Sequence, residues 1–203
     1  MLKWPIVLAL VMVLLSAAKT SAQEHPAANL PVPRTTLSPA ERARAVQIAS
    51  PQQPALSVFS LSSQDRARTV ISNVQAVGAG KTDKQLALVT IYQYQGNITL
   101  NRVVDLGSNQ IVSEERIPNG AAPLAAVEVE YARSLALAND RVIQLVAPFH
   151  DTAKLEFLLT TTMDQNSPWF GKRTVSAVIR TPRGYVSGPQ ITVNLTDGRV
   201  NVE

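Results

Sequence analysis

The sequence predicts an α+β protein of two tandem units, each a helix packed on an antiparallel sheet of about four strands. Three observations support this class: a capped helix near residue 38, β-branched runs separated by short turns from residue 70, and the same order again from residue 123. A helix laid across an antiparallel sheet buries one face of each. One larger α+β domain with a single continuous sheet is the alternative.

A capping box opens the first unit, which is expected to span residues 37–118. Ser38 can cap a helix that begins with Pro39, and Glu41 stands three residues after the cap. The helix is expected to end near Ala49, because the following prolines cannot continue it. Its inward residues would be Ala45, Val46 and Ile48.

Four strand-like runs follow this helix, and short turns rich in Gly and Asn separate them. Runs and turns at such regular spacing indicate an antiparallel meander, with each strand beside its neighbour in the sequence. The runs are residues 70–77, 86–94, 98–105 and 110–116. The turns are Gly78-Ala79-Gly80, Gln95-Gly96-Asn97 and Gly107-Ser108-Asn109.

The second unit, residues 119–203, repeats the order of helix and strands. Its helix begins at Pro123 and either ends near Asn139 or continues to Val146. The apolar side would hold Leu124, Val127, Val129, Tyr131, Ala132 and Leu135, and the polar side Glu128, Glu130 and Arg133. The strand-like runs are residues 155–163, 174–181, 190–195 and 200–202, the last after an Asp197-Gly198 turn.

The first 22 residues have the pattern of a secretory signal peptide. Lys3 is followed by an apolar run over residues 5–15 and then by small residues, so cleavage is expected after Ala22. The run is shorter than the roughly 20 residues that cross a membrane, although an uncleaved anchor is the alternative. Residues 23–36, rich in Pro and Ala, are expected to form an extended leader. The mature protein should therefore be periplasmic or secreted, without a transmembrane segment.

Composition excludes several classes of function. Removal of Lys3 and Lys19 with the signal lowers the 19 basic residues to 17 against 15 acidic ones, a net charge of +2. The basic residues are scattered and aromatic residues are few, so nucleic-acid binding is not expected. The chain has no cysteine, which excludes thiolate nucleophiles and cysteine zinc sites.

Three stretches carry a family resemblance. They are the helix at residues 37–46, the hairpin at residues 89–118 with its Val103-Val104-Asp105-Leu106, turn, Ile111-Val112-Ser113 pattern, and the helix that ends before Asp140-Arg141-Val142. Over about residues 37–146 the chain resembles the small N-terminal domains of copper amine oxidases.

In that family these domains are cystatin-like α+β modules that flank the catalytic domain and do not supply its chemistry. The resemblance therefore implies two cystatin-like units and an accessory role. The family's catalytic domain needs an Asn-Tyr-Asp/Glu motif, whose Tyr becomes the quinone cofactor, and a His-x-His copper pair. The sequence contains neither, so we expect no cofactor and no enzymatic activity.

Other candidate motifs favour structural roles. The Gly78–Thr82 segment has Gln75 where a phosphate-binding loop needs glycine, so it is expected to be a turn. His150-Asp151 holds the only histidine after the leader, and no nucleophile elbow accompanies it. The pairs Glu114/Glu115 and Glu128/Glu130 are expected to be solvated charges.

The loop around Trp169 is the best candidate for binding a partner. Trp169 and Phe170 precede two cations, Lys172 and Arg173, and exposed aromatics beside such charges are typical of interface hot spots. These four residues predict a protein partner. The alternative is that Trp169 folds back to cover an edge of the sheet.

The new N-terminus suggests a metal site. After cleavage, the amine of Gln23, two backbone amides and the imidazole of His25, with Glu24 between them, would form a square-planar nitrogen set suited to Cu(II) or Ni(II). Cyclisation of Gln23 would remove the amine.

Together the features of the sequence favour an exported, non-enzymatic binding or accessory module. The alternatives are an envelope-associated docking protein and an enzyme with an unrecognised site.

Overall fold

The computed structural model describes residues 36–50, 68–77, 85–162 and 164–203, apart from the side chains of His150 and Asp151. All of them belong to one compact unit of the chain, Pro31–Glu203. The predicted signal peptide, the leader up to residue 35 and the turn at residues 78–80 lie outside the described residues. Within the described part, no helix is long and apolar enough to cross a membrane.

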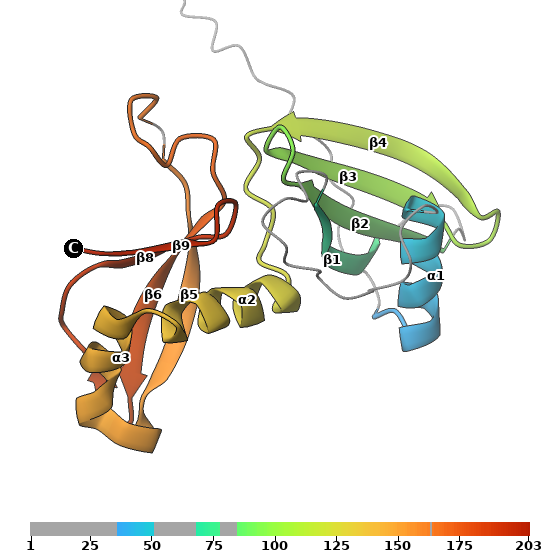
Figure 1. The fold of residues 1–203 in the computed structure, drawn as a ribbon. Helices are drawn as coiled ribbons and strands as arrows, with labels where there is room; N and C mark the ends of the chain where they lie inside the picture. The colour runs from blue at the N-terminus through green and yellow to red at the C-terminus, as the bar shows by residue number, and fades with distance from the viewer. Residues whose placement is uncertain (1–35, 51–67, 78–84, 163) are drawn as a thin grey trace, which may run out of the picture. The chain divides into compact units, whose positions relative to one another are not determined.

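The first sheet is the predicted meander (Figure 1). Its strands lie side by side in sequence order, and each pair is antiparallel. The register of the last pair shifts after Val103, which leaves Val112 as an extra residue in the outer strand. The strands are β1 (Thr69–Val77), β2 (Leu86–Gln93), β3 (Ile98–Asp105) and β4 (Gln110–Pro118).

Helix α1 (Pro39–Ala49) packs against this sheet and has the predicted capping box. The Ser38 hydroxyl accepts a hydrogen bond from the Glu41 N–H, and the Glu41 carboxylate accepts one from the Ser38 N–H at 2.7 Å. Ala45 and Ala49 are fully buried, whereas Ile48 is only half-buried. The shared core consists of Leu37, Ala45, Ala49, Ala76, Ala87, Val89, Ile91, Leu100, Val104 and Leu106.

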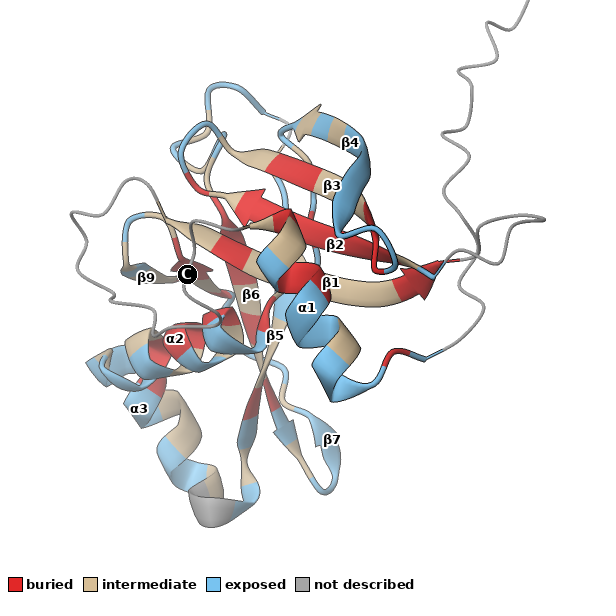
Figure 2. Ribbon diagram, turned by 90° about the vertical axis from the view of Figure 1, so that its right-hand side faces the viewer, coloured by how far each residue is buried: buried red, intermediate tan, exposed pale blue. Residues whose placement is uncertain are grey.

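Burial differs strongly between inner and outer strands of this sheet (Figure 2). Strand β2 is buried at six successive positions, Ala87–Tyr92, whereas Gln110–Glu114 of β4 are all exposed. A strand buried on both faces needs cover on each side. The first sheet therefore uses more than α1 to build its core.

The second sheet is also antiparallel, with the order β5-β6-β8-β9 and a two-residue strand, β7, paired with β6. The helices that precede it are α2 (Ala126–Leu137), α3 (Asp140–Val146) and the 3-10 helix η1 (Ala147–Thr152). The strands are β5 (Lys154–Thr160), β6 (Thr174–Thr181), β7 (Gly184–Tyr185), β8 (Ile191–Asn194) and β9 (Arg199–Val202).

The α+β class and the two antiparallel sheets are confirmed, with two local differences in the second half. The long helix breaks at Asn139, whose side chain accepts hydrogen bonds from the N–H groups of Arg141 and Val142 and so caps a separate helix, α3. Val127, expected on the apolar side of α2, is 40% exposed. The division into two domains at residue 118 stays a prediction.

The core of the second sheet reaches beyond its own elements. It is built around α2, β6 and β8, yet it also contains Val70 of β1, Tyr92 of β2 and Tyr94 just after β2. Because these three residues come from the first sheet and its end, the second core covers a part of that sheet that the α1 core does not. The two tyrosines also bring aromatic rings next to a buried pair of charges.

Candidate functional site

A buried ion pair lies at the centre of the candidate site. The Arg173 Nε donates to Glu128 Oε1 at 2.7 Å, and Arg173 Nη2 donates to Glu128 Oε2 at 2.8 Å. The exposed fractions of the two side chains are only 2% and 0%. This bidentate geometry is a strong arrangement of a guanidinium and a carboxylate. Because both groups are buried, loss of either one would leave the other charge without a partner away from water.

The same two side chains hold the start of α2. Glu128 is the third residue of the helix, and its Oε2 accepts a hydrogen bond from the N–H of Ala125 at 2.8 Å, as in half of a capping box. The Arg173 guanidinium donates to the carbonyl oxygens of Ala122 and Pro123, both at 2.9 Å. The ion pair therefore ties the beginning of α2 to the beginning of β6.

Two tyrosines from the first sheet complete the charged centre. Tyr92 and Tyr94 are two residues apart along β2 and its end, and their rings meet edge to face with centroids 4.9 Å apart. The guanidinium of Arg173 lies 4.2 Å from the Tyr92 ring centroid, and that of Arg68 lies 4.4 Å from the Tyr94 centroid. The Tyr94 hydroxyl donates to Glu128 Oε1 at 2.6 Å.

Arg68 provides a second connection between the sheets. Its Nη2 donates to the carbonyl oxygens of Leu195 at 3.0 Å and Thr196 at 2.8 Å, in the turn after β8. Its Nη1 is buried and has no hydrogen-bond partner among the residues that the structure describes. The centre thus contains two cations stacked on two aromatic rings around one carboxylate.

The environment shifts the pKa values of the two tyrosines and of Arg173. Burial raises the pKa of the Tyr92 hydroxyl from 10.0 to about 12, although the positive charge of Arg173 opposes the rise. Burial, and then the negative charge of Glu128, raise the pKa of Tyr94 as well. Burial acts to lower the pKa of Arg173, but the hydrogen bond and charge of Glu128 outweigh it and raise that pKa. Both phenols stay neutral hydrogen-bond donors at ordinary pH.

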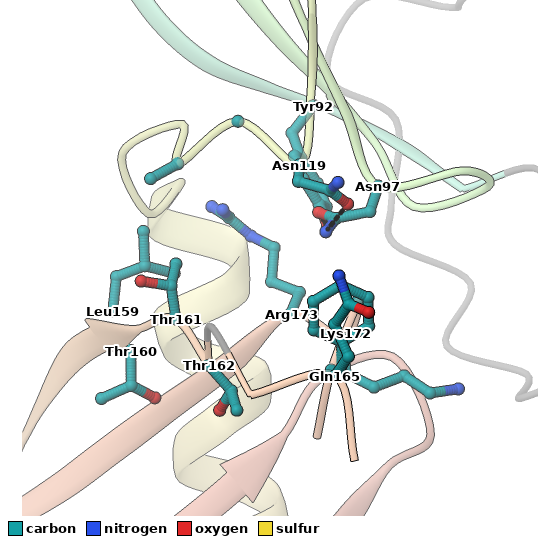
Figure 3. A pocket seen from close by; sticks show the side chains of 14 residues that line it. Tyr92, Asn97, Asn119, Leu159, Thr160, Thr161, Thr162, Gln165, Lys172 and Arg173 are labelled. Atoms are coloured by element: carbon teal, nitrogen blue, oxygen red, sulfur yellow. Dashed lines mark hydrogen bonds between the residues drawn. The ribbon is translucent and has the colours of Figure 1, made fainter. Parts of the chain in front are cut away.

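A polar pocket of about 240 Å³ opens beside the charged centre (Figure 3). Tyr92 connects the charged centre to this pocket, because its hydroxyl donates a hydrogen bond to Asn97 Oδ1 at 2.6 Å. Asn97 Nδ2 donates in turn to Asn119 Oδ1 at 3.1 Å. This chain of hydrogen bonds turns the Asn119 Oδ1 toward Asn97 and leaves the Asn119 NH₂ group without a partner among the described residues.

Backbone geometry supports the two asparagines. Asn97 and Asn119 have φ angles of 51° and 54°, in the left-handed region that asparagine tolerates, and the Asn119 N–H donates to the Asn97 carbonyl at 2.7 Å. Gly120 follows at a close approach, where a Cβ would lie 2.8 Å from Thr99 Oγ1. The pocket wall is therefore rigid at this point.

The opposite wall of the pocket comes from the second sheet. It consists of the end of β5, the two threonines after it, and the loop that leads into β6. Figure 3 shows the threonines on one side and Asn97 and Asn119 on another, with Arg173 between them. The lining residues from this half are Leu159, Thr160, Thr161, Thr162, Gln165, Phe170, Gly171, Lys172 and Arg173.

The predicted partner-binding residues separate into two groups. Phe170 is 39% exposed and lines the pocket, and Lys172 lines it while its Nζ pairs with Asp197 Oδ1 at 3.2 Å. Trp169 is half-buried. Arg173, expected to be exposed beside them, is instead 3% exposed, because it is the partner of Glu128. The surface available to a partner is thus made by Trp169, Phe170 and Lys172.

The expected solvated role of Glu128 was wrong. It shares a helical face with the buried Tyr131, Ala132 and Ala136, so it points into the core, whereas Glu130 is 69% exposed and pairs with Arg133. Its position three residues after the N-cap, Ala125, was the available signal. The sequence reasoning also missed Tyr92, Tyr94 and the asparagine pair, because they had been interpreted only as strand and turn residues.

The remaining candidates have simpler outcomes. Glu114 is exposed and pairs with Arg102 on the neighbouring strand at 2.7 Å. His150 lies in η1, a 3-10 helix before β5. The Gln23–His25 metal site lies outside the described residues and stays a prediction. Within the residues that the structure covers, no group of His, Cys, Asp and Glu has the arrangement of a metal site.

Comparison with known proteins gives a fold and no family. No protein-family model matches the chain, and neither does any curated protein. A solved copper-containing benzylamine oxidase from Hansenula polymorpha is similar at a TM-score of 0.51 and 11% identity. The likeness covers 84% of this chain but only 29% of the oxidase. It is consistent with the distant resemblance to copper amine oxidases, and it shows the fold alone.

A second solved structure, the C-terminal domain of YpeB from Bacillus megaterium, gives a much weaker likeness. Its identity is 12%, with 83% of this chain and 63% of that domain covered, and its TM-score is 0.19. So low a score carries no argument about fold or function.

Proposed function

We propose that this protein is an exported, non-enzymatic binding or accessory module whose binding centre is the pocket beside Phe170. The observation that carries the proposal is the chemistry of the pocket lining. Its polar groups are amides, hydroxyls and two cations, and the cations, Lys172 and Arg173, are already paired with Asp197 and Glu128. Such groups hold and orient a ligand.

A binding role agrees better with these groups than catalysis does. General acid–base catalysis uses a group whose pKa lies near the working pH. The lining contains no aspartate, glutamate or histidine among the described residues. Its phenol, Tyr92, has a pKa raised to about 12, so it serves as a fixed donor to Asn97.

The fold likeness supports the accessory role, and the signal-peptide pattern alone supports the exported location. Domains of this kind flank the catalytic domain in copper amine oxidases, and the signal-peptide pattern favours a periplasmic or secreted product. A protein partner would contact the exposed Phe170 and the half-buried Trp169 and Lys172.

The proposal is tested on protein recovered from the exported fraction, whose N-terminus is expected at Gln23 by mass spectrometry. Isotope-labelled protein is titrated with a library of small polar fragments and followed by NMR. Shifts of the Asn97 and Asn119 side-chain amides are expected, with the bound fragment recovered unchanged. Chemical conversion of a fragment, or a pocket that no fragment perturbs, would refute it. Copper(II) titration of the same material tests the Gln23–His25 site by its visible d–d band.

A further inference from the structure

The pocket beside Phe170 offers several polar groups that the protein itself does not use. The NH₂ group of Asn119, the Gln165 amide and the hydroxyls of Thr161 and Thr162 all lie in its lining. None of these groups has a hydrogen-bond partner among the described residues, whereas Thr160 is bonded to Thr174. A ligand that fills the pocket would therefore meet donors and acceptors on both walls.

These groups are uncharged, and the two cations in the lining, Lys172 and Arg173, are each paired with a carboxylate. The ammonium of Lys172 lies 3.2 Å from Asp197 Oδ1, and the Arg173 guanidinium makes four hydrogen bonds, two to Glu128 and two to carbonyl oxygens. An anionic ligand would lose its hydration without gaining an unpaired cation, and a cation would find no carboxylate among the described lining residues. The pocket is suited to an uncharged ligand.

An apolar ligand is disfavoured for the opposite reason. Filling the pocket with hydrocarbon would cut the amides and hydroxyls off from water without replacing their hydrogen bonds. At the same time, Phe170, Leu159 and Ala121 give the lining an apolar part, and the ring of Phe170 is 39% exposed. The ligand must combine many hydroxyl or amide groups with a face of C–H bonds.

The geometry of the asparagine pair adds selectivity. Because Tyr92 donates to Asn97 and Asn97 Nδ2 donates to Asn119 Oδ1, the orientation of the Asn119 amide is fixed and its NH₂ group is left to donate. The positive φ angles and the close approach of Gly120 to Thr99 hold this amide in place before any ligand binds. Preorganised donors lose little conformational entropy on binding.

From these features we infer that the pocket binds one ring of a neutral carbohydrate. A pyranose has hydroxyls that both donate and accept, and a C–H face that can stack on Phe170. The volume of about 240 Å³ lies below the roughly 300–1,000 Å³ of pockets for drug-sized ligands, which fits a single ring. This inference rests on the proposed binding function and names its ligand class.

The test titrates the labelled exported protein with the methyl glycosides of glucose, galactose, mannose and N-acetylglucosamine. Glucuronate and glucose 6-phosphate serve as charged probes, and N-acetyl-alanyl-alanine amide as a peptide probe. At least one neutral glycoside is expected to shift the side-chain amides of Asn119 and Gln165. The charged sugars should bind about tenfold more weakly or worse.

Matched variants locate the site. Phe170→Ala and Asn119→Gly should each weaken glycoside binding about tenfold or more by calorimetry. Tyr185→Ala removes an exposed aromatic ring elsewhere, and Asn109→Gly removes an asparagine of similar positive φ from another turn, so neither should change the affinity. Glycine tolerates the left-handed backbone at both asparagine positions, which keeps these two variants folded.

Each other result overturns the inference. Charged sugars that bind as tightly as neutral ones would contradict the neutral pocket, and affinity lost equally in the control variants would place the sugar elsewhere. Binding of the peptide amide or of other fragments without any glycoside would exclude carbohydrate but leave the proposed binding function standing. A pocket that no probe perturbs would refute both.

Discussion

Two clusters in the molecule contain the same three residue types in very different surroundings. Glu128 is bound by Arg173 and by the Tyr94 hydroxyl, and Glu156 is bound by Arg180 and by the Tyr185 hydroxyl. In both, the shortest Arg–Glu distance is 2.7 Å. The phenol–carboxylate distances are 2.6 Å in the first cluster and 3.0 Å in the second.

Exposure separates the two clusters. The Arg173 and Glu128 side chains are 2% and 0% exposed, against 58% and 34% for Arg180 and Glu156. In the exposed cluster, the hydrogen bond from Arg180 and then that from Tyr185 lower the pKa of Glu156, but water can replace either partner. In the buried cluster no such replacement exists. The contacts in the buried cluster are therefore expected to matter for the stability of the fold, whereas the similar contacts in the exposed cluster contribute little to it.

The largest expected difference comes from removing one arginine. Arg173→Met leaves the Glu128 carboxylate buried without its partner, so the free energy of unfolding should fall by about 3–5 kcal/mol. Arg180→Met, the matched change in the exposed cluster, should alter it little. Urea unfolding followed by circular dichroism measures both.

A double replacement keeps this test decisive if Arg173→Met does not fold. Exchange of both Glu128 and Arg173 for methionine removes the uncompensated charge, so the double variant should be more stable than the single one. Equal losses in Arg173→Met and Arg180→Met would show that burial does not separate the clusters.

A smaller difference is expected from the phenols. Tyr94→Phe removes the 2.6 Å hydrogen bond to the buried Glu128 and should cost about 1–3 kcal/mol. Tyr185→Phe, which removes the matching bond to Glu156, should leave the urea midpoint nearly unchanged. A midpoint shift in Tyr185→Phe as large as that in Tyr94→Phe would contradict the comparison.

The smallest effect concerns alkaline pH. The pKa of Tyr92 is raised from 10.0 to about 12 by burial, so in this range the unfolded chain has lost the phenol proton that the folded protein keeps. The folded state then binds more protons than the unfolded state, and stability falls as pH rises from 10 towards 12. Urea midpoints measured along this range should decline less steeply in Tyr92→Phe than in the parent protein. An identical decline would exclude Tyr92 as its source.

Local patterns in the sequence predicted most of the fold. The capping box of α1 depends on residues 38–41 alone, and the meander of β1–β4 depends on turns of a few residues between strands. The loop around Trp169 was also predicted, and Phe170 and Lys172 line the pocket, whereas the binding role of the loop stays a prediction. Such features depend on residues that are close together in the chain, so a local sequence pattern is enough to predict them.

The site itself was decided by contacts between distant residues. The position of Glu128 in the helix sequence is compatible with either an exposed or a buried side chain. Its burial is favourable only because Arg173, 45 residues later, and Tyr94, 34 residues earlier, offset the cost of removing the carboxylate from water. The asparagine amides likewise gain their direction from Tyr92. The sequence by itself determined the elements and their order. Tertiary structure decided which charges leave water, because desolvation is favourable only where distant partners converge on the same carboxylate.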